Sequence, residues 1–259
     1  MRVLFVGDVV GGAGRRGLAA KLPQLRESHG VDLAIVNGEN SAGGMGINEK
    51  SARDIFAAGA DLITLGNHAY RQRDSYELLD NEERIVRPAN YPKGNPGRGS
   101  AIVEIGGRKV GVLNLSGGLQ LTVARAPFHA ADAEIAELER RGADFVIVDF
   151  HAEVTSEKVA LGWYLDGRVA AVLGTHTHVP TADGRVLPRG TAFISDVGMT
   201  GSRQSVLGVR IEDAMETFTR QMPTRFNTAE DDVWINAVLF DVGEDGLATS
   251  FTQILEPAG

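Results

Sequence analysis

The chain has 259 residues, which fits one large α/β domain or two small ones, and its 43% hydrophobic and 23% charged residues are ordinary for a soluble globular protein. A net charge of −8 argues against a broad electrostatic grip on duplex DNA, although bound cations can reverse the local field for a small phosphorylated substrate. The chain has no cysteine, which excludes disulfides, zinc–thiolate sites and iron–sulfur clusters, so any metal must be held by oxygen and imidazole nitrogen.

The N-terminus leads directly into an apolar strand at 2–6 and does not resemble a signal peptide. No apolar run is long enough to span a bilayer. We therefore expect a cytoplasmic protein without a membrane partner.

Strands and helices alternate over the first part of the chain. Asn48 is the expected N-cap of a helix that Gly59 closes, and Pro23 is expected to kink or restart the helix before it. The predicted elements are strands at 2–6, 32–36 and 61–65, a glycine-rich turn at 11–14, and helices at 15–27 and 48–58. This alternation predicts a largely parallel sheet with crossover helices, whose ligands gather at the carboxyl ends of the strands.

The second part of the chain continues the alternation after a hairpin. Residues 91–100, with three glycines and two prolines, are expected to form a loop between two halves of a single domain that spans residues 1–259. Thr155 is a predicted helix cap. The predicted elements are a hairpin at 100–105 and 109–115, helices at 130–141, 155–165 and 211–221, strands at 144–150, 169–173 and 191–194, and a closing hairpin at 233–242 and 247–255.

Polar side chains recur where the predicted strands end. Hard oxygen ligands combined with imidazoles suit manganese, iron or zinc. A carboxylate between two imidazole-rich clusters suits a pair of ions about 3.5–4 Å apart. The candidates are Asp8, Glu39, Asn40, Asn67, His68, His151, His176 and His178.

Each of these positions is a weak signal by itself. His176 and His178 alone are equally compatible with structural histidines in a turn, Asp8 with a helix cap, and Asn40 with a left-handed turn residue. Their repeated coincidence with strand ends favours metal binding. The glycine-rich turn at 11–14 lacks both the dinucleotide fingerprint and the P-loop pattern, so neither site is expected.

Three blocks resemble motifs of the calcineurin-like metallophosphoesterases: Gly66-Asn67-His68, a lone His151 after a strand, and Gly174-Thr175-His176-Thr177-His178. Two other blocks differ from the usual pattern. The usual Asp-x-His is here Asp8-Val9-Val10, and the usual Gly-Asp-x-x-Asp is here Asn37-Gly38-Glu39-Asn40. This combination resembles the YmdB-like subfamily of bacterial phosphodiesterases over nearly the whole chain.

The resemblance implies an α/β fold, a metallophosphoesterase-type four-layer sandwich in which two mixed β-sheets are flanked by helices. It also implies a dinuclear centre of two divalent metal ions, iron or manganese, with zinc as an alternative. One ion would be held by Asp8, Glu39, Asn40 and His178, and the other by Glu39, Asn67, His151 and His176. Because Asn40 replaces the missing first-block histidine, we expect the first ion to be held less tightly.

The resemblance further implies a small phosphodiester substrate, such as a 2′,3′-cyclic nucleotide. Two cations lower the pKa of a bridging water and so supply a hydroxide nucleophile, and His68 would act as general acid rather than as a ligand. A regulatory protein that binds a nucleotide or an RNA end through its metals, with low turnover, is the alternative. An intact His68 favours catalysis. A homo-oligomer is a further expectation, with the closing hairpin offering an edge strand to the partner.

Overall fold

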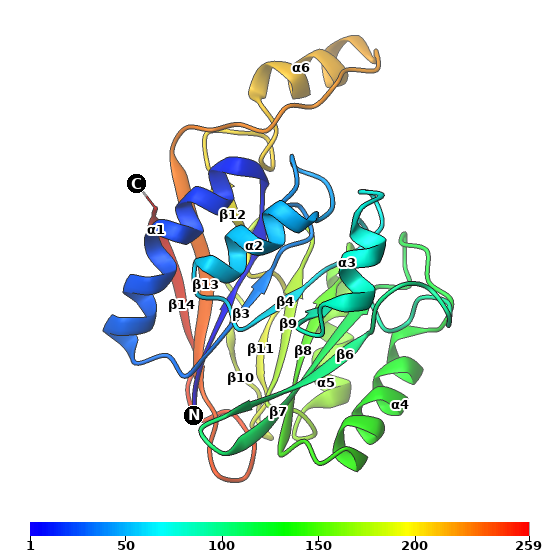
Figure 1. Ribbon diagram of the computed structural model, residues 1–259, viewed down its shortest axis with the longest axis vertical. Helices are drawn as coiled ribbons and strands as arrows, with labels where there is room; N and C mark the ends of the chain where they lie inside the picture. Colours follow the sequence, from blue (N-terminus) through cyan, green and yellow to red (C-terminus); the bar gives the residue numbers. More distant parts are fainter. Residues whose placement is uncertain (259) are drawn as a thin grey trace.

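The computed structural model describes residues 1–258, which form two mixed β-sheets with helices on their outer faces (Figure 1). The first sheet has eight strands in the order β2-β12-β13-β1-β3-β4-β5, with β14 paired to β13. These strands are β1 (Arg2–Val6), β2 (Asp8–Val9), β3 (Leu33–Asn37), β4 (Leu62–Thr64), β5 (Ile85–Val86), β12 (Met199–Ser202), β13 (Val233–Asp241) and β14 (Thr252–Pro257).

The second sheet has six strands in the order β10-β11-β9-β8-β7-β6. The predicted loop at 91–100 connects β5 of the first sheet to β6 of the second. The strands are β6 (Ser100–Ile105), β7 (Arg108–Ser116), β8 (Phe145–His151), β9 (Ala171–Thr175), β10 (Arg185–Val186) and β11 (Ala192–Ile194).

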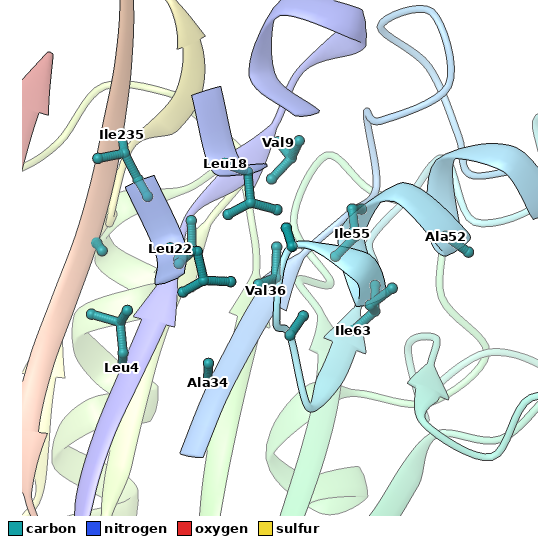
Figure 2. Close-up of a cluster of buried hydrophobic side chains, with 14 of the residues drawn as sticks. Leu4, Val9, Leu18, Leu22, Ala34, Val36, Ala52, Ile55, Ile63 and Ile235 are labelled. Atoms are coloured by element: carbon teal, nitrogen blue, oxygen red, sulfur yellow. The ribbon is translucent and has the colours of Figure 1, made fainter. Parts of the chain in front are cut away.

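Alternation along β1 explains how the layers pack. Successive side chains of a strand point to opposite faces. Leu4 therefore packs with Leu18 and Leu22 of α1 (Gly11–His29), beside α2 (Glu49–Ala57), in the cluster that Figure 2 shows. Val3 and Phe5 on the other face of β1 pack into the core between the two sheets.

The outer face of the second sheet is covered in the same way. Val146 and Val148 of β8 pack with Ile135 of α4 (Pro127–Arg140) and Leu161 of α5 (Thr155–Leu165). Helix, sheet, sheet and helix thus form four layers, which confirms the predicted fold class.

Helix α3 (Ser75–Asn81) adds Leu79 to the outer cluster of the first sheet, whereas α6 (Ile211–Arg220) lies outside the four layers. Helix α6 projects from the body at the top of Figure 1. None of the helices within residues 1–258 combines the length and the apolar character needed to cross a membrane.

Several local expectations are confirmed and others are wrong. Asn48 caps α2 in a capping box with Ser51. The predicted turn at 11–14 is instead the first turn of α1, and a Cβ on Gly14 would lie 2.4 Å from the Thr200 carbonyl oxygen. Gly14 therefore allows close packing of the helix on β12, and the pattern indicates a helix contact and not a loop. The helix also continues through Pro23.

Other boundaries also differ from the prediction, among them the start of α5 and the closing hairpin. Thr155 is the first residue of α5 and not its cap, because Val154 occupies the N-cap without a side-chain hydrogen bond. The closing hairpin has a longer connection than expected, since β14 starts only at Thr252. Neither difference moves a candidate site residue.

Candidate metal centre

Four polar atoms from both sheets converge on one point. His151, the last residue of β8, places its Nε2 atom 3.1 Å from Glu39 Oε2, 3.0 Å from Asn67 Oδ1 and 3.0 Å from His176 Nδ1. Glu39 follows β3, Asn67 follows β4 and His176 follows β9. Suitable atoms of Glu39, His151 and His176 all lie within 4.8 Å of one another, a spacing that one ion could share.

A looser group lies beside this point. Asp8 Oδ1 is 3.8 Å from His178 Nε2 and 3.9 Å from His151 Nδ1, so Asp8 stands close to both histidines. Asn40 Nδ2 lies 3.1 Å from His178 Nε2. His178 Nδ1 lies 3.0 Å from the Leu207 carbonyl oxygen and donates to it, which leaves Nε2 turned toward Asp8.

His68 is held through one edge of its ring. Its Nδ1 atom lies 2.8 Å from Asn40 Oδ1 and 3.1 Å from Glu39 Oε1, and its backbone N–H donates to Glu39 Oε2 at 3.1 Å. The oxygen of Asn40, which is the atom that would bind a cation, therefore points toward His68. For Asn40 this differs from the role that the resemblance implies.

Two carboxylate oxygens show that this arrangement fits cations. Asp8 Oδ1 is buried and has no hydrogen-bond partner within residues 1–258, and the only donor near the buried Glu39 Oε1 is His68 Nδ1, at 3.1 Å. An ionised oxygen buried in this way is costly unless a positive charge compensates it. Gly66 keeps the space open, since a Cβ there would lie 2.2 Å from Glu39 Oε2 and 2.2 Å from His151 Cδ2.

The buried groups shift one another's pKa values strongly. Burial opposes ionisation of Glu39, but His151 and His68 outweigh it and hold the pKa of Glu39 well below its usual range. Burial also opposes charging of His151, yet Glu39 raises the pKa of His151 to about 9. Burial and the neighbouring His151 lower the pKa of His176 to about 3, so His176 is neutral, as a metal ligand must be. Burial raises the pKa of Asp8, although His178 and His151 oppose this shift.

A buried polar chain fixes the ring of His151. Thr175 Oγ1 donates to Asp149 Oδ1 at 2.7 Å and therefore accepts from His151 Nδ1 at 2.9 Å. Asn37 Nδ2 donates to Asp149 Oδ2 at 2.9 Å from the first sheet. His151 Nε2 is left free to face the convergence point, which is the arrangement that supporting groups give to a metal-binding histidine.

The turn that contains His176 and His178 is strained and is held by Asp196. His176 has φ 98° and His178 has φ 66°, a region that non-glycine residues rarely adopt. Asp196 Oδ2 accepts from Thr177 N at 3.0 Å and Thr177 Oγ1 at 2.7 Å, and it pairs with Lys158 Nζ at 2.7 Å. Both members of this ion pair are nearly fully buried.

A pocket of about 330 Å³ opens above these side chains. All candidates except Asp8, Asn67 and His151 line it directly. Glu153, which the sequence did not single out, stands at this pocket with its Oε2 atom 2.9 Å from His176 Nε2.

The supporting residues were missed for different reasons. Asp196 follows β11 and so carried the same strand-end signal as the candidates. Asp149 lies inside a strand and Lys158 inside a helix, where nothing in the pattern distinguishes them.

Comparison with known proteins extends over nearly the whole chain. A model of the YmdB-like protein family matches residues 4–254. A 2′,3′-cyclic-nucleotide 2′-phosphodiesterase from Bacillus subtilis (strain 168) is 45% identical over 244 residues, which cover 94% of this chain and 92% of the relative.

Two solved structures are also similar. A hypothetical protein from Thermus thermophilus has a TM-score of 0.93 and 42% identity, with 99% of both chains covered. A novel phosphatase from Mycoplasma pneumoniae has a TM-score of 0.92 and 35% identity, with 99% of this chain and 93% of that chain covered.

Replacing Asp196 with asparagine should loosen the histidine turn, because the amide cannot compensate the charge of buried Lys158. Breaking a buried ion pair typically costs about 3–5 kcal/mol. Losing a group that supports a ligand typically weakens metal affinity about 10–100-fold. Urea unfolding of the metal-free protein and titration with Mn²⁺ measure the two effects.

The matched control is Asp132→Asn, which removes a partly exposed partner of Arg168 and should change stability by less than about 1 kcal/mol. Adding Lys158→Met to Asp196→Asn should restore part of the stability but not the Mn²⁺ affinity. Wild-type Mn²⁺ affinity in Asp196→Asn would show that the turn does not depend on this pair.

Proposed function

The chain belongs to the YmdB-like protein family, and from this premise we propose that it is a metal-dependent phosphodiesterase that hydrolyses small phosphodiesters, 2′,3′-cyclic nucleotides in particular. The observation that supports this most directly is the convergence of Glu39, Asn67 and His176 on His151 Nε2 beside an open pocket. The activity in the name of the Bacillus subtilis relative agrees with it.

We assign the convergent group to one divalent ion, with Glu39, Asn67, His151 and His176 as its ligands. Asp8, Glu39, Asn40 and His178 form the second position. Oxygen and imidazole donors suit iron or manganese, with zinc as an alternative. When bound, two such ions lower the pKa of water and neutralise phosphate charge.

The second position is the weaker one on geometric grounds. Asp8 Oδ1 and His178 Nε2 are 3.8 Å apart, and Asn40 directs its oxygen toward His68. The amide of Asn40 must turn before its oxygen can bind a cation. This requirement supports unequal affinities for the two ions.

His68 is suited to hold the proton that the leaving group needs. Asn40 Oδ1 and Glu39 Oε1 occupy its Nδ1 edge, so Nε2 on the opposite side of the ring is left for the pocket. Hydrolysis joins a water oxygen to phosphorus and breaks one phosphorus–oxygen ester bond. His68 delivers its Nε2 proton to the departing ribose oxygen, and the product is a phosphomonoester.

A direct assay separates this function from that of a regulatory nucleotide or RNA-end binder. With Mn²⁺ the protein should release nitrophenolate from bis-p-nitrophenyl phosphate, because the bound ions activate water. EDTA should abolish this release and added Mn²⁺ should restore it. A rate equal to that of buffer would contradict the enzyme and favour the binding protein.

His68→Ala should lower turnover by about 10²–10⁴-fold, the usual contribution of a general acid, while metal content is retained. His129→Ala is the control, because His129 is an exposed residue of α4 outside the site. Steady-state kinetics and elemental analysis of the same samples give both quantities. Loss of metal from His68→Ala would make His68 a ligand and not an acid.

His176→Ala and His178→Ala should each deplete a different ion. Since His176 belongs to the compact group, its loss should remove the tightly held ion, whereas His178→Ala should spare that ion and remove the weaker one. Mn²⁺ titration followed by electron paramagnetic resonance distinguishes the two. Two equally tight ions in the wild type, or loss of the same ion from both variants, would contradict the assignment.

A further inference from the structure

A second hollow, of about 410 Å³, adjoins the pocket over the candidate metal centre. His178 and Leu207 line both spaces, so a ligand can extend from one into the other across these two residues. The hollow lies against β12, β13 and β14, away from His68. Much of its lining is apolar, including Val179, Pro180, Met199 and Leu255.

Trp234 supplies a flat aromatic surface in this hollow. The guanidinium carbon of Arg203 lies 4.4 Å from the centre of the indole ring, and both residues line the space. Trp234 Nε1 donates to Asp232 Oδ1 at 2.8 Å, which fixes the plane of the ring. Because the guanidinium lies over one face of the ring, the two side chains form a stacked pair, and such aromatic rings and arginines are groups on which nucleic-acid bases stack.

Asn236 adds a polar group to the same wall. It lies two residues after Trp234 on β13, so both side chains project from the same face of the strand. Asn236 is only 9% exposed, and within residues 1–258 its side-chain amide has no hydrogen-bond partner, although its backbone N–H bonds to Thr200 Oγ1. A buried amide offers both a donor and an acceptor, the combination that recognises the polar edge of a base.

We propose that this hollow, lined by Trp234, Arg203 and Asn236, receives the base of a 2′,3′-cyclic mononucleotide whose phosphate lies at the metal centre. The inference rests on the proposed function and adds the place where the base of its substrate binds. The base stacks on the Trp234 wall and bonds to the Asn236 amide, and the ribose lies over His178 and Leu207. The protein then selects nucleotides over cyclic diesters that have no base.

A pair of substrates tests this selection in the metal-loaded enzyme. Adenosine 2′,3′-cyclic phosphate and glycerol 1,2-cyclic phosphate share the five-membered cyclic diester, but only the first has a base. Trp234→Leu should lower kcat/KM for the nucleotide about 5- to 150-fold, mainly through KM, as expected for a lost base stack. Asn236→Ala should act in the same direction, and both variants should leave the glycerol diester unaffected.

Trp163→Leu is the matched control, since Trp163 is the other of the two tryptophans and is 50% exposed on α5. It should leave the ratio of the two kcat/KM values unchanged. Equal losses on both substrates in Trp234→Leu would overturn the proposal, because the hollow would then only support the metal site.

A binding measurement decides the case independently of turnover. Trp163→Phe leaves Trp234 as the sole tryptophan, and adenosine 3′-monophosphate should quench its fluorescence in a saturable way, whereas glycerol phosphate should not. If the wild type hydrolyses neither cyclic diester, the proposed function fails, and quenching still decides whether the hollow binds a base. Absence of quenching overturns the proposal.

Discussion

The site depends on one constraint, which is the burial of two carboxylates with too little positive charge around them from the protein. Asp8 and Glu39 are fully buried; within residues 1–258 Asp8 Oδ1 has no hydrogen-bond partner, and Glu39 Oε1 has only His68 Nδ1 beside it. In a metal-free chain, a proton on His151 beside Glu39 supplies part of the missing positive charge. Divalent ions would supply more of it, which is why these donors are arranged for cations and not for packing.

Both sheets contribute to holding this arrangement. Asn37 of β3 reaches Asp149 of β8, and through Thr175 this contact sets the ring of His151. On the other side, α5 contributes Lys158, whose buried charge is balanced by Asp196. The strained backbone at the histidine turn persists because Asp196, which lies outside the turn, holds Thr177 in place. The contacts that hold the two sheets together therefore also position the candidate metal ligands.

Much of the fold and the position of the site followed from local rules. Apolar runs ending in polar residues predicted β1, β3, β4 and β8, and the strand-end rule placed the candidate side chains at one edge. The prediction for the glycines at 11–14 was wrong because a glycine in a tight helix contact and a glycine in a turn give the same sequence pattern. That difference depends on Thr200, which lies far along the chain.

The sequence by itself determined the types of donor, their places at strand ends and the absence of thiolate chemistry, since these depend on residue identity and short-range periodicity. Only the tertiary structure decided which donors share a point, that the oxygen of Asn40 faces His68, and that Lys158 supports the histidine turn. It also decided that the Trp234 face of β13 borders a hollow next to His178. The physical reason is that the distances between such residues are set by how the two sheets pack on their shared core. The alternation of side chains along one strand does not indicate which strand lies opposite it across that core.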